Sequence, residues 1–128
     1  MSEYEKSKLN RVKRGANRAS YDVEQIHRIV DAGFIGYVSY IFEEKAICLP
    51  MAYGRRDNRI ILHGSNANRM LTTLLKAKEM SMTVMHLDAL VMARSGLHHS
   101  VNYRSATLFG TPKKIEEKRK KMPPYSVL

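Results

Sequence analysis

The stretch FIGYVSYIFEEKAICLPMAY, residues 34–53, decides the fold of this chain. Aromatic and β-branched residues dominate its first half, Phe34 to Phe42, and this composition is typical of a strand. The pair Glu43-Glu44 then interrupts the apolar run as a polar turn, and Ala46 to Tyr53 reads as the returning strand. The stretch therefore predicts a β-hairpin. Pro50 has no backbone N–H to donate, so we expect it at an edge or a bulge of the sheet.

Further elements are predicted on both sides of this hairpin. Upstream, Ser20 can cap a helix whose apolar residues recur at helical spacing up to Gly33. Downstream, a second helix begins near Ala67, where apolar residues again recur every three or four positions. The remaining apolar runs predict four short strands, with Asp88 between the second and the third. These strands are residues 59–63, 82–87, 90–94 and 101–109.

Six short strands with two or three helices, and without strict alternation of strand and helix, favour an α+β fold that is mainly β. We expect an antiparallel sheet closed into a small six-stranded barrel rather than a parallel, doubly wound sheet. A chain of 128 residues has room for one such domain. We place the barrel at residues 20–112, between a basic N-terminal arm at 1–19 and a basic C-terminal tail at 113–128.

The formal net charge of +10, from 22 basic and 12 acidic residues, is concentrated at the two ends of the chain. Residues 1–20 and 112–128 each hold six basic and two acidic residues, whereas residues 21–111 hold ten and eight. A basic tail can bind nucleic acid or an anionic membrane through nonspecific electrostatics, although a solvated tail is the commoner case. The charge therefore describes the tails, and the patterned region is nearly neutral.

Composition also predicts a compartment. No apolar stretch approaches the roughly 20 residues of a membrane-spanning helix, and the charged N-terminus is unlike a secretory signal. The single cysteine, Cys48, lies in a predicted strand, where we expect a buried and inert thiol. These features together predict a cytoplasmic protein.

The segment from Leu62 to Arg69, with the sequence LHGSNANR, is the most informative candidate site, because a predicted strand there runs into the start of a helix. Free amides at a helix N-terminus, with Ser65 and Asn68 as donors and Arg69 as a cation, could form a phosphate pocket. The same spacing also suits an ordinary helix cap at Ser65 or Asn66, with Arg69 in solvent. Spacing alone leaves both interpretations open, and the cap is the commoner of the two.

Other kinds of chemistry lack support in the sequence. His98 and His99 are adjacent, so on an extended chain their rings point to opposite faces and cannot both bind one metal ion. Paired carboxylates, a Gly-rich dinucleotide fingerprint and a Walker sequence are absent from the sequence. We therefore predict neither a metal site nor nucleoside-triphosphate chemistry.

Several motifs together resemble a known family. They are Arg14-Gly15, Arg18-Ala19-Ser20-Tyr21, Leu49 to Arg55, Leu62 to Ser65, Ala93 to Ser105 and Leu108-Phe109-Gly110. Over about residues 8–111 the chain is similar to the flavin-binding split-barrel proteins related to pyridoxamine 5'-phosphate oxidase, and most of all to the nitroimidazole-resistance branch. The resemblance implies a six-stranded split barrel, a homodimer, and one flavin mononucleotide (FMN) in each of two clefts between the subunits.

The resemblance also implies which residues contact the cofactor. They are Pro50, Met51, Ala52, Tyr53, His63, Gly64, Ser65, Asn68, Arg69 and Ser105. The first four would run along the isoalloxazine ring, the next two would border the ribityl chain, and the helix start would hold the phosphate. Relatives carry an Arg-Lys pair where this chain has Asn68-Arg69, so one cation is missing. His63 would lie close to the reacting centre, as a candidate catalytic residue.

A flavin-dependent oxidoreductase is the function that the resemblance implies, either nitroreductase-like or pyridoxamine-phosphate-oxidase-like, with the flavin supplying the redox chemistry. One fold serves several functions, so two alternatives stay open: a non-enzymatic binder of flavin or another cofactor, and a basic nucleic-acid-binding module. Relatives continue well past the last strand, whereas this chain stops at Leu128. Truncation of the C-terminal tail is therefore one interpretation of its ending.

Overall fold

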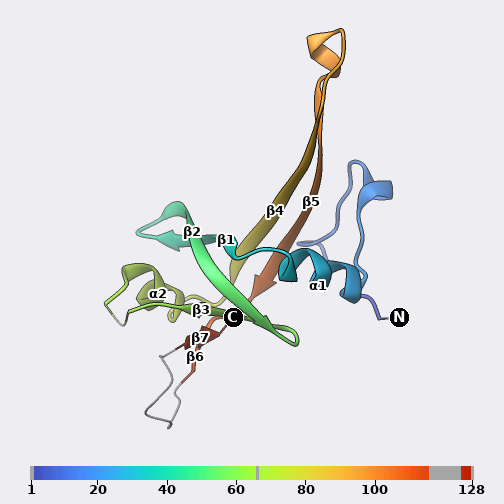
Figure 1. The fold of residues 1–128 in the computed structure, drawn as a ribbon. Helices are drawn as coiled ribbons and strands as arrows, with labels where there is room; N and C mark the ends of the chain where they lie inside the picture. The colour runs from blue at the N-terminus through green and yellow to red at the C-terminus, as the bar shows by residue number, and fades with distance from the viewer. Residues whose placement is uncertain (1, 66, 116–124, 128) are drawn as a thin grey trace.

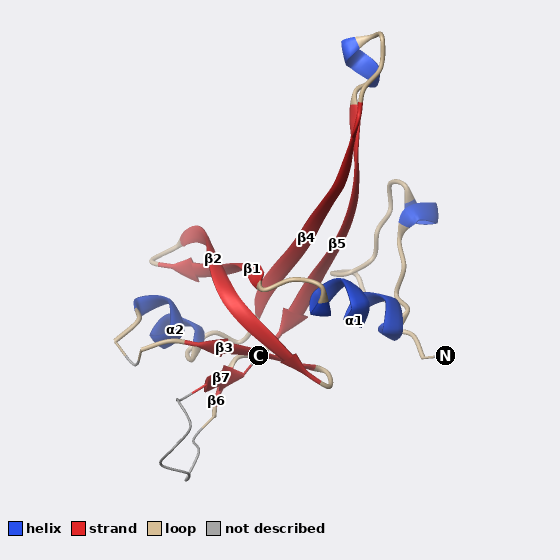
Figure 2. Ribbon diagram, viewed as in Figure 1, coloured by secondary structure: helices blue, strands red, loops and turns tan. Residues whose placement is uncertain are grey.

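The computed structural model describes residues 2–65, 67–115 and 125–127 of the chain. Its helices and strands are drawn in Figures 1 and 2. In chain order they are the 3-10 helix η1 (Ala16–Arg18), α1 (Val23–Asp31), β1 (Ile35–Phe42), β2 (Lys45–Arg56), β3 (Arg59–His63), α2 (Arg69–Leu74), β4 (Met80–Val91), the 3-10 helix η2 (Gly96–His98), β5 (Ser100–Gly110), β6 (Lys113–Lys114) and β7 (Tyr125–Val127).

One antiparallel sheet holds all of these strands, in the order β5-β4-β1-β2-β3-β7-β6. The prediction of a mainly β, antiparallel fold with two α-helices is therefore confirmed. Within the described residues the two end strands, β5 and β6, do not pair with each other, so the curved sheet is not closed (Figure 2). This open arrangement differs from the closed barrel that we expected.

The predicted hairpin is present and organises the sheet. Strands β1 and β2 pair from Ile35 opposite Ala52 to Phe42 opposite Lys45. The two turn residues, Glu43 and Glu44, have positive φ angles of 48° and 64°, which a tight hairpin turn requires. Beyond Ala52, β2 leaves β1 and pairs with β3 up to Arg56, so it is longer than predicted.

The core lies on the inner face of the sheet. Its fully buried side chains are Val30, Val38, Leu62, Met82 and Val84. Helix α1 covers β2, β4 and β5, while α2 lies against β1. The nitrogen Nε2 of His86 lies 2.8 Å from the Ile29 carbonyl oxygen and ties β4 to α1. The outer face of β1, β2, β4 and β5 has no covering element among the described residues, and this face includes Cys48.

Three local predictions are wrong, each for a physical reason. Helix α1 is capped by Asp22, which accepts a hydrogen bond from the Gln25 amide at 2.9 Å, rather than by Ser20. The predicted break at Asp88 is a β-bulge, because the register with β5 shifts between Leu87 and Ala89 while β4 continues. Cys48 is exposed, because its strand position faces the uncovered side of the sheet.

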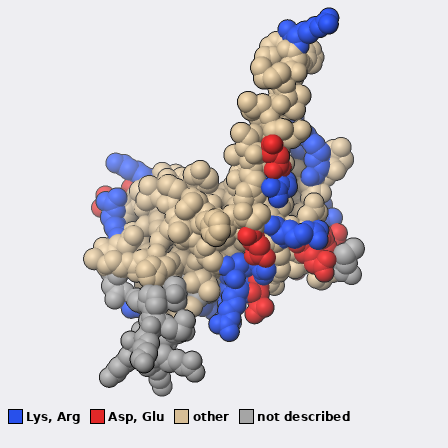
Figure 3. Space-filling view, viewed as in Figure 1, with Lys and Arg blue, Asp and Glu red and all other residues tan. Residues whose placement is uncertain are grey.

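Strands β4 and β5 extend beyond the rest of the sheet as a two-stranded arm, with η2 at its tip (Figure 1). Much of the arm is uncharged in Figure 3. Several of its apolar side chains are exposed, and the Leu97 residue at the tip is 89% accessible. The others are Leu87, Leu90, Val91, Met92, Val101 and Tyr103. The arm therefore presents apolar surface that this single chain does not bury.

The two ends of the chain differ in what the structure describes. The predicted N-terminal arm lies against α1, where Glu3 and Asp22 form an isolated β-bridge. Of the predicted C-terminal tail, Lys113 and Lys114 form β6, and β7 lies between β3 and β6. Residues 116–124 and 128 lie outside the described residues. Within the described parts of the chain, neither α-helix has the length and apolar character needed to cross a membrane.

Candidate functional site

The candidate site is built where β2 comes close to the connection between β3 and α2. Gly64 marks the meeting point, because a Cβ atom added there would lie 3.5 Å from Met51 Cε and 2.5 Å from Leu71 Cδ1. Gly64 has no side chain, so the connection can approach both elements this closely. Two segments that the sequence singled out separately, residues 50–53 and 62–69, are therefore neighbours in space.

Among the described residues, strand β2 has backbone groups without a strand partner next to this connection. Residues 45–52 pair with β1 on one side, and β3 begins to pair only at Tyr53. The Tyr53 amide donates to the Phe34 carbonyl on the β1 side at 3.0 Å. Because backbone groups alternate sides along an antiparallel strand, those of Pro50 and Ala52 point away from β1. The missing N–H of Pro50 falls at this open edge, which confirms the expected edge position.

Tyr53 supports the site, but its hydroxyl and its amide both already donate hydrogen bonds within the chain. Its hydroxyl donates to the Val30 carbonyl of α1, and its amide is used by Phe34. Burial raises the pKa of Tyr53 above its ordinary value, and the negative charge of Asp31 raises it further. Of the residues 50–53 expected to offer backbone groups to the ring, those at the open edge therefore end at Ala52.

The start of α2 is an ordinary capped helix. The Asn68 side-chain oxygen accepts hydrogen bonds from the amides of Met70 and Leu71, at 2.9 and 3.3 Å. Ser65 accepts from the amide of Ala67 at 3.1 Å through its hydroxyl, and from the amide of Asn68 at 2.9 Å through its carbonyl. The expectation of several free amides here is wrong, because Asn68 and Ser65 already accept hydrogen bonds from these amides. A ligand would meet side chains instead: the Ser65 hydroxyl hydrogen, the Asn68 amide NH2 group and Arg69.

Arg69 lies over the ring of Phe42, which is not among the predicted site residues. Its guanidinium carbon is 4.7 Å from the centre of the Phe42 ring, within cation–π range. This contact directs Arg69 toward the β1–β2 hairpin. The alternation of β1 already placed Phe42 on the same face as Val38 and Tyr40. That α2 would bring an arginine over this face depends on tertiary packing.

His63 ends β3 and is exposed. The paired register of Tyr53 with Leu62 places Ala52 opposite His63 at the next position along the two strands. Side chains of opposed residues share one face of a sheet, so the imidazole lies on the same outer face as Ala52 and Pro50. His63 is therefore near the open edge of β2.

Ser105 is not part of this group within one chain. It lies on β5, opposite Met85 of β4. Strands β4 and β1 separate it from β2, which at the usual spacing between strands amounts to about 14 Å. The structure thus brings residues 50–53 next to Gly64 and His63, places Arg69 over Phe42 at the end of the hairpin, and leaves Ser105 apart within one chain.

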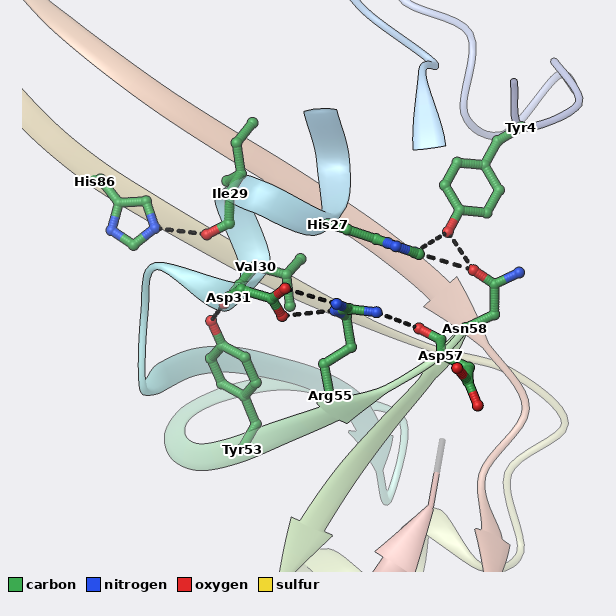
Figure 4. Close-up of polar contacts among 10 residues, drawn as sticks. All are labelled: Tyr4, His27, Ile29, Val30, Asp31, Tyr53, Arg55, Asp57, Asn58 and His86. Carbon is green, nitrogen blue, oxygen red and sulfur yellow. Dashed lines mark hydrogen bonds and ion pairs between the residues drawn. The ribbon is translucent and has the colours of Figure 1, made fainter. Parts of the chain in front are cut away.

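A polar network fixes the neighbouring turn between β2 and β3 to α1 (Figure 4). Arg55 donates to both carboxylate oxygens of Asp31, with the distances from Nε to Oδ1 and from Nη2 to Oδ2 both 2.6 Å. The guanidinium lowers the pKa of Asp31 through these hydrogen bonds. The Tyr4 hydroxyl donates to Asn58 Oδ1 at 2.6 Å, and His27 Nε2 lies 2.9 Å from that hydroxyl. The pairs are separated by 23 to 54 positions in sequence, and no local pattern signals them.

Comparisons with known proteins agree with this architecture. The family described as pyridoxamine 5'-phosphate oxidase matches residues 22–123. The structure of the flavocytochrome Anf3 from Azotobacter vinelandii is 32% identical, with a TM-score of 0.80 over 87% of this chain. A FAD and heme binding protein from Mycobacterium smegmatis is 31% identical, with a TM-score of 0.72 over 76% of this chain. The present chain covers 51% and 47% of these two proteins, about half of each.

A more distant structure shares the fold alone. It is a protein from Bacteroides thetaiotaomicron named for 5-nitroimidazole antibiotic resistance, 16% identical, with a TM-score of 0.66 over 83% of this chain and 78% of its own. A search among proteins of curated function returned no match. The family match covers most of the chain, and the predicted split-barrel motifs lie within it or close to it. The chain belongs to the pyridoxamine 5'-phosphate oxidase family.

Proposed function

We propose that this protein binds a flavin along the open edge of β2 and acts as a flavin-dependent oxidoreductase. The observation that carries the proposal is the approach of Gly64 to Met51, which joins the predicted ring-binding strand to the predicted phosphate-binding segment. The two relatives with about 30% identity support it, since one is a flavocytochrome and the other binds FAD and heme. Nitroreductase-like and pyridoxamine-phosphate-oxidase-like reactions are the two reaction types we propose.

The donor groups at the site suit a flavin. The unpaired backbone groups at Pro50 and Ala52 match the hydrogen-bonding edge of an isoalloxazine ring. Arg69, with the Ser65 hydroxyl and the Asn68 amide group, provides a cation and neutral donors for one phosphate. FMN ends at such a phosphate, which makes it the simplest ligand for this donor set. When bound, the flavin supplies the electron transfer.

His63 is the residue proposed to act on the substrate. Its imidazole lies on the exposed outer face beside Ala52 and can hold a proton or a hydrogen bond at that position. A nitroaromatic substrate presents oxygen atoms that accept such a hydrogen bond. The other predicted residues bind and orient the flavin. The tests below therefore measure flavin binding and turnover separately.

We also propose that the site is completed in a homodimer. Ser105 is about three strand spacings from Ala52 within one chain, so it would contact a flavin only from a second copy. The outer face that a second copy would cover is apolar and exposed. Its large side chains are Ile35, Tyr37, Ile41, Met85 and Phe109. Closure of a split barrel is part of the same proposal, because the two end strands of the sheet do not pair with each other in the described part of one chain.

Haem is a second candidate cofactor, because both relatives with about 30% identity contain haem or cytochrome in their names. The observation that favours it is His98, which is exposed near the tip of the arm. Its ring makes no hydrogen bond to the other described residues, whereas His86 and His99 use Nε2 on backbone carbonyls. An axial ligand needs a free ring nitrogen. Added haemin should then give a Soret shift that His98→Ala removes and His99→Ala retains.

Flavin binding is tested with the purified protein and added FMN or FAD. We expect flavin absorbance that stays with the protein on desalting, and an affinity that falls at least tenfold in Arg69→Glu. Arg59→Glu makes the same charge change at the other end of β3 and should bind normally. A protein that takes up neither FMN nor FAD contradicts the proposal.

The reaction is tested separately with a 5-nitroimidazole and a chemical reductant of flavin. We expect turnover by the wild type, with His63→Ala retaining the flavin and losing most of the activity. Full binding together with full turnover in His63→Ala would show that His63 is not the catalytic residue. Binding without turnover on either nitroaromatic or pyridoxamine phosphate would favour the non-enzymatic flavin binder.

A further inference from the structure

A second candidate site is a large cleft beside β5. It has a volume of about 1140 Å³ and lies between β5, α1 and the N-terminal segment, residues 4–21. Every residue from Val101 to Thr111 lines it, so it follows β5 along its length. In Figure 1 the N-terminal segment stands on the same side of the molecule as the arm. The cleft is thus a groove beside a strand.

Strand β5 presents an open edge to this groove. It is the first strand of the sheet order, and in the described chain its partner is β4, from Met80 opposite Gly110 to Val91 opposite Ser100. Its other edge therefore carries a row of backbone N–H and C=O groups without a strand partner. An edge of eleven residues is long for a protein, and such edges template pairing with another extended chain.

The wall opposite β5 is basic. Arg11, Arg14 and Arg18 line the cleft, and none of them forms an ion pair within the described residues. The other two arginines of the lining, Arg55 and Arg104, are already paired with Asp31 and Asp88. Glu5, Asp57 and Asp88 are the carboxylates of the lining. The arginines of the N-terminal segment are therefore the charges available to a ligand.

The floor of the groove is apolar. Ile26 and Ile29 of α1 and Leu108 of β5 are partly buried and line it. The wall is held in place at its base, where the Tyr4 amide donates to the Tyr21 carbonyl at 2.8 Å. A ligand in this groove would therefore meet backbone groups on one side, arginines on the other and aliphatic side chains below.

We propose that this groove binds an extended, acidic peptide segment of a partner protein, which adds to β5 as a further strand. The open edge supplies the main-chain hydrogen bonds, as in other cases of strand addition. Alternate side chains of a strand point to opposite faces, so one set would be apolar and face Ile26, Ile29 and Leu108. The other set would be acidic and face Arg11, Arg14 and Arg18, where charge-assisted hydrogen bonds form.

Nine of the ten proposed flavin residues lie on β2, β3, α2 or the connection before α2, and none of these nine lines the cleft. The tenth, Ser105 of β5, does line the cleft and is proposed to contact only the flavin of a second copy. The inference therefore goes beyond the proposed function and does not depend on it. Peptide binding can be measured with or without added flavin.

The probe is a fluorescein-labelled peptide of four Val-Glu repeats, and its binding is followed by fluorescence anisotropy. We expect saturable binding to the full chain, at least tenfold weaker for four Val-Lys repeats. The double variant Arg11→Glu/Arg14→Glu should weaken binding by about tenfold, since two attractions become repulsions. Arg56→Glu/Arg59→Glu makes the same charge change on an exposed turn outside the cleft and should bind like the wild type.

A backbone-modified peptide tests strand addition itself. Methylation of alternate peptide nitrogens removes the hydrogen-bond donors of one edge, so one of the two methylation registers should abolish binding. Hydrogen exchange should show new protection at β5 amides. The proposal is overturned if both methylated peptides bind as tightly as the parent peptide. It is also overturned if the Arg11→Glu/Arg14→Glu variant binds the peptide as tightly as the wild type, or if the wild type does not bind the peptide at all. If the Arg11→Glu/Arg14→Glu variant without peptide has half the solution mass of the wild type, a second copy of the chain occupies the edge instead, and the proposal is overturned.

Discussion

Arg55 and Asp31 form a two-point ion pair that ties β2 to the last residue of α1, with both nitrogen–oxygen distances at 2.6 Å (Figure 4). A third hydrogen bond, from Arg55 Nη1, reaches the Asp57 carbonyl at 2.7 Å. One guanidinium therefore fixes both the turn between β2 and β3 and the end of the helix. Tyr53, two residues earlier on β2, bonds the Val30 carbonyl of the same helix. The strand that carries the candidate site is held in place by these contacts.

Asp31→Asn should lower the free energy of unfolding by about 0.5–1 kcal/mol at pH 7, the upper part of the range for exposed pairs, because the geometry is bidentate. Asp31 is 49% exposed, which limits the effect. The pKa of Asp31 is lowered in the folded state, so its contribution is present above about pH 4 and lost as the pH falls through the folded-state value. Urea titrations should show a larger difference at pH 7 than at pH 2.5.

Asp57→Asn is the matched control for this prediction. It removes a carboxylate from the same turn, but Arg55 bonds the Asp57 backbone carbonyl, which the substitution leaves in place. Asn also tolerates the φ of 54° at this position. Equal losses in the two variants would mean that general charge, and not the ion pair, stabilises the turn.

Two glycines in neighbouring strands should respond in opposite ways to alanine. At Gly36 an added Cβ would lie 2.5 Å from the Sδ and 2.8 Å from the Cγ of the buried Met82, so Gly36→Ala should cost about 1–3 kcal/mol. At Gly54 nothing lies within 4 Å, and alanine should stabilise by up to about 1 kcal/mol by restricting the unfolded chain. Thermal unfolding measures both. A stable Gly36→Ala variant would show that Met82 moves aside freely.

Local patterns determine much of this fold. The alternation from Phe34 to Phe42 and the polar pair after it were enough to predict the hairpin, because a hairpin is a local structure. The same patterns suggested a break at Asp88, since a single polar residue resembles a turn, whereas the strand continues through a bulge. Whether β5 and β6 close a barrel depends on contacts between distant parts of the chain, which local patterns do not encode.

The segments that form the candidate site were predictable from the sequence, whereas the contacts of its individual side chains were less so. The approach of Gly64 to Met51 follows from the pairing of β2 with β3, which brings the end of β3 beside β2. Two features depend on side-chain geometry. Asn68 accepts hydrogen bonds from amides of α2, and Arg69 lies over the Phe42 ring. The separation of Ser105 depends on strand order, which a linear motif does not reveal.

Asn68 has a capping role that can be separated from its proposed ligand contact. Asn68→Ala removes the acceptor for the Met70 and Leu71 amides and should cost about 1 kcal/mol of stability. Asn68→Asp keeps the acceptor but places a negative charge beside the proposed phosphate, so it should retain stability and weaken flavin binding. Thermal unfolding and flavin titration of both variants check this. Unchanged flavin affinity in Asn68→Asp would remove Asn68 from the proposed site.

The outer face of the sheet gives a last prediction, on assembly. Ile41 is 63% exposed on this face, opposite Ala46 of β2 and on the same side as Tyr37. A dimer that buries the face would have to bury the ammonium of Ile41→Lys, at a cost far above the loss of one apolar contact. We expect light scattering to give twice the chain mass for the wild type and the single chain mass for this variant.

Leu9→Lys serves as its control, because Leu9 is 56% exposed and lies on the N-terminal segment rather than on a strand of the sheet. It should leave the mass unchanged. Flavin binding should fall together with the dimer in Ile41→Lys, since Ser105 would no longer reach the second site. Retention of full flavin affinity by a monomeric Ile41→Lys variant would show that one chain forms the whole site, and the role proposed for Ser105 would then be wrong.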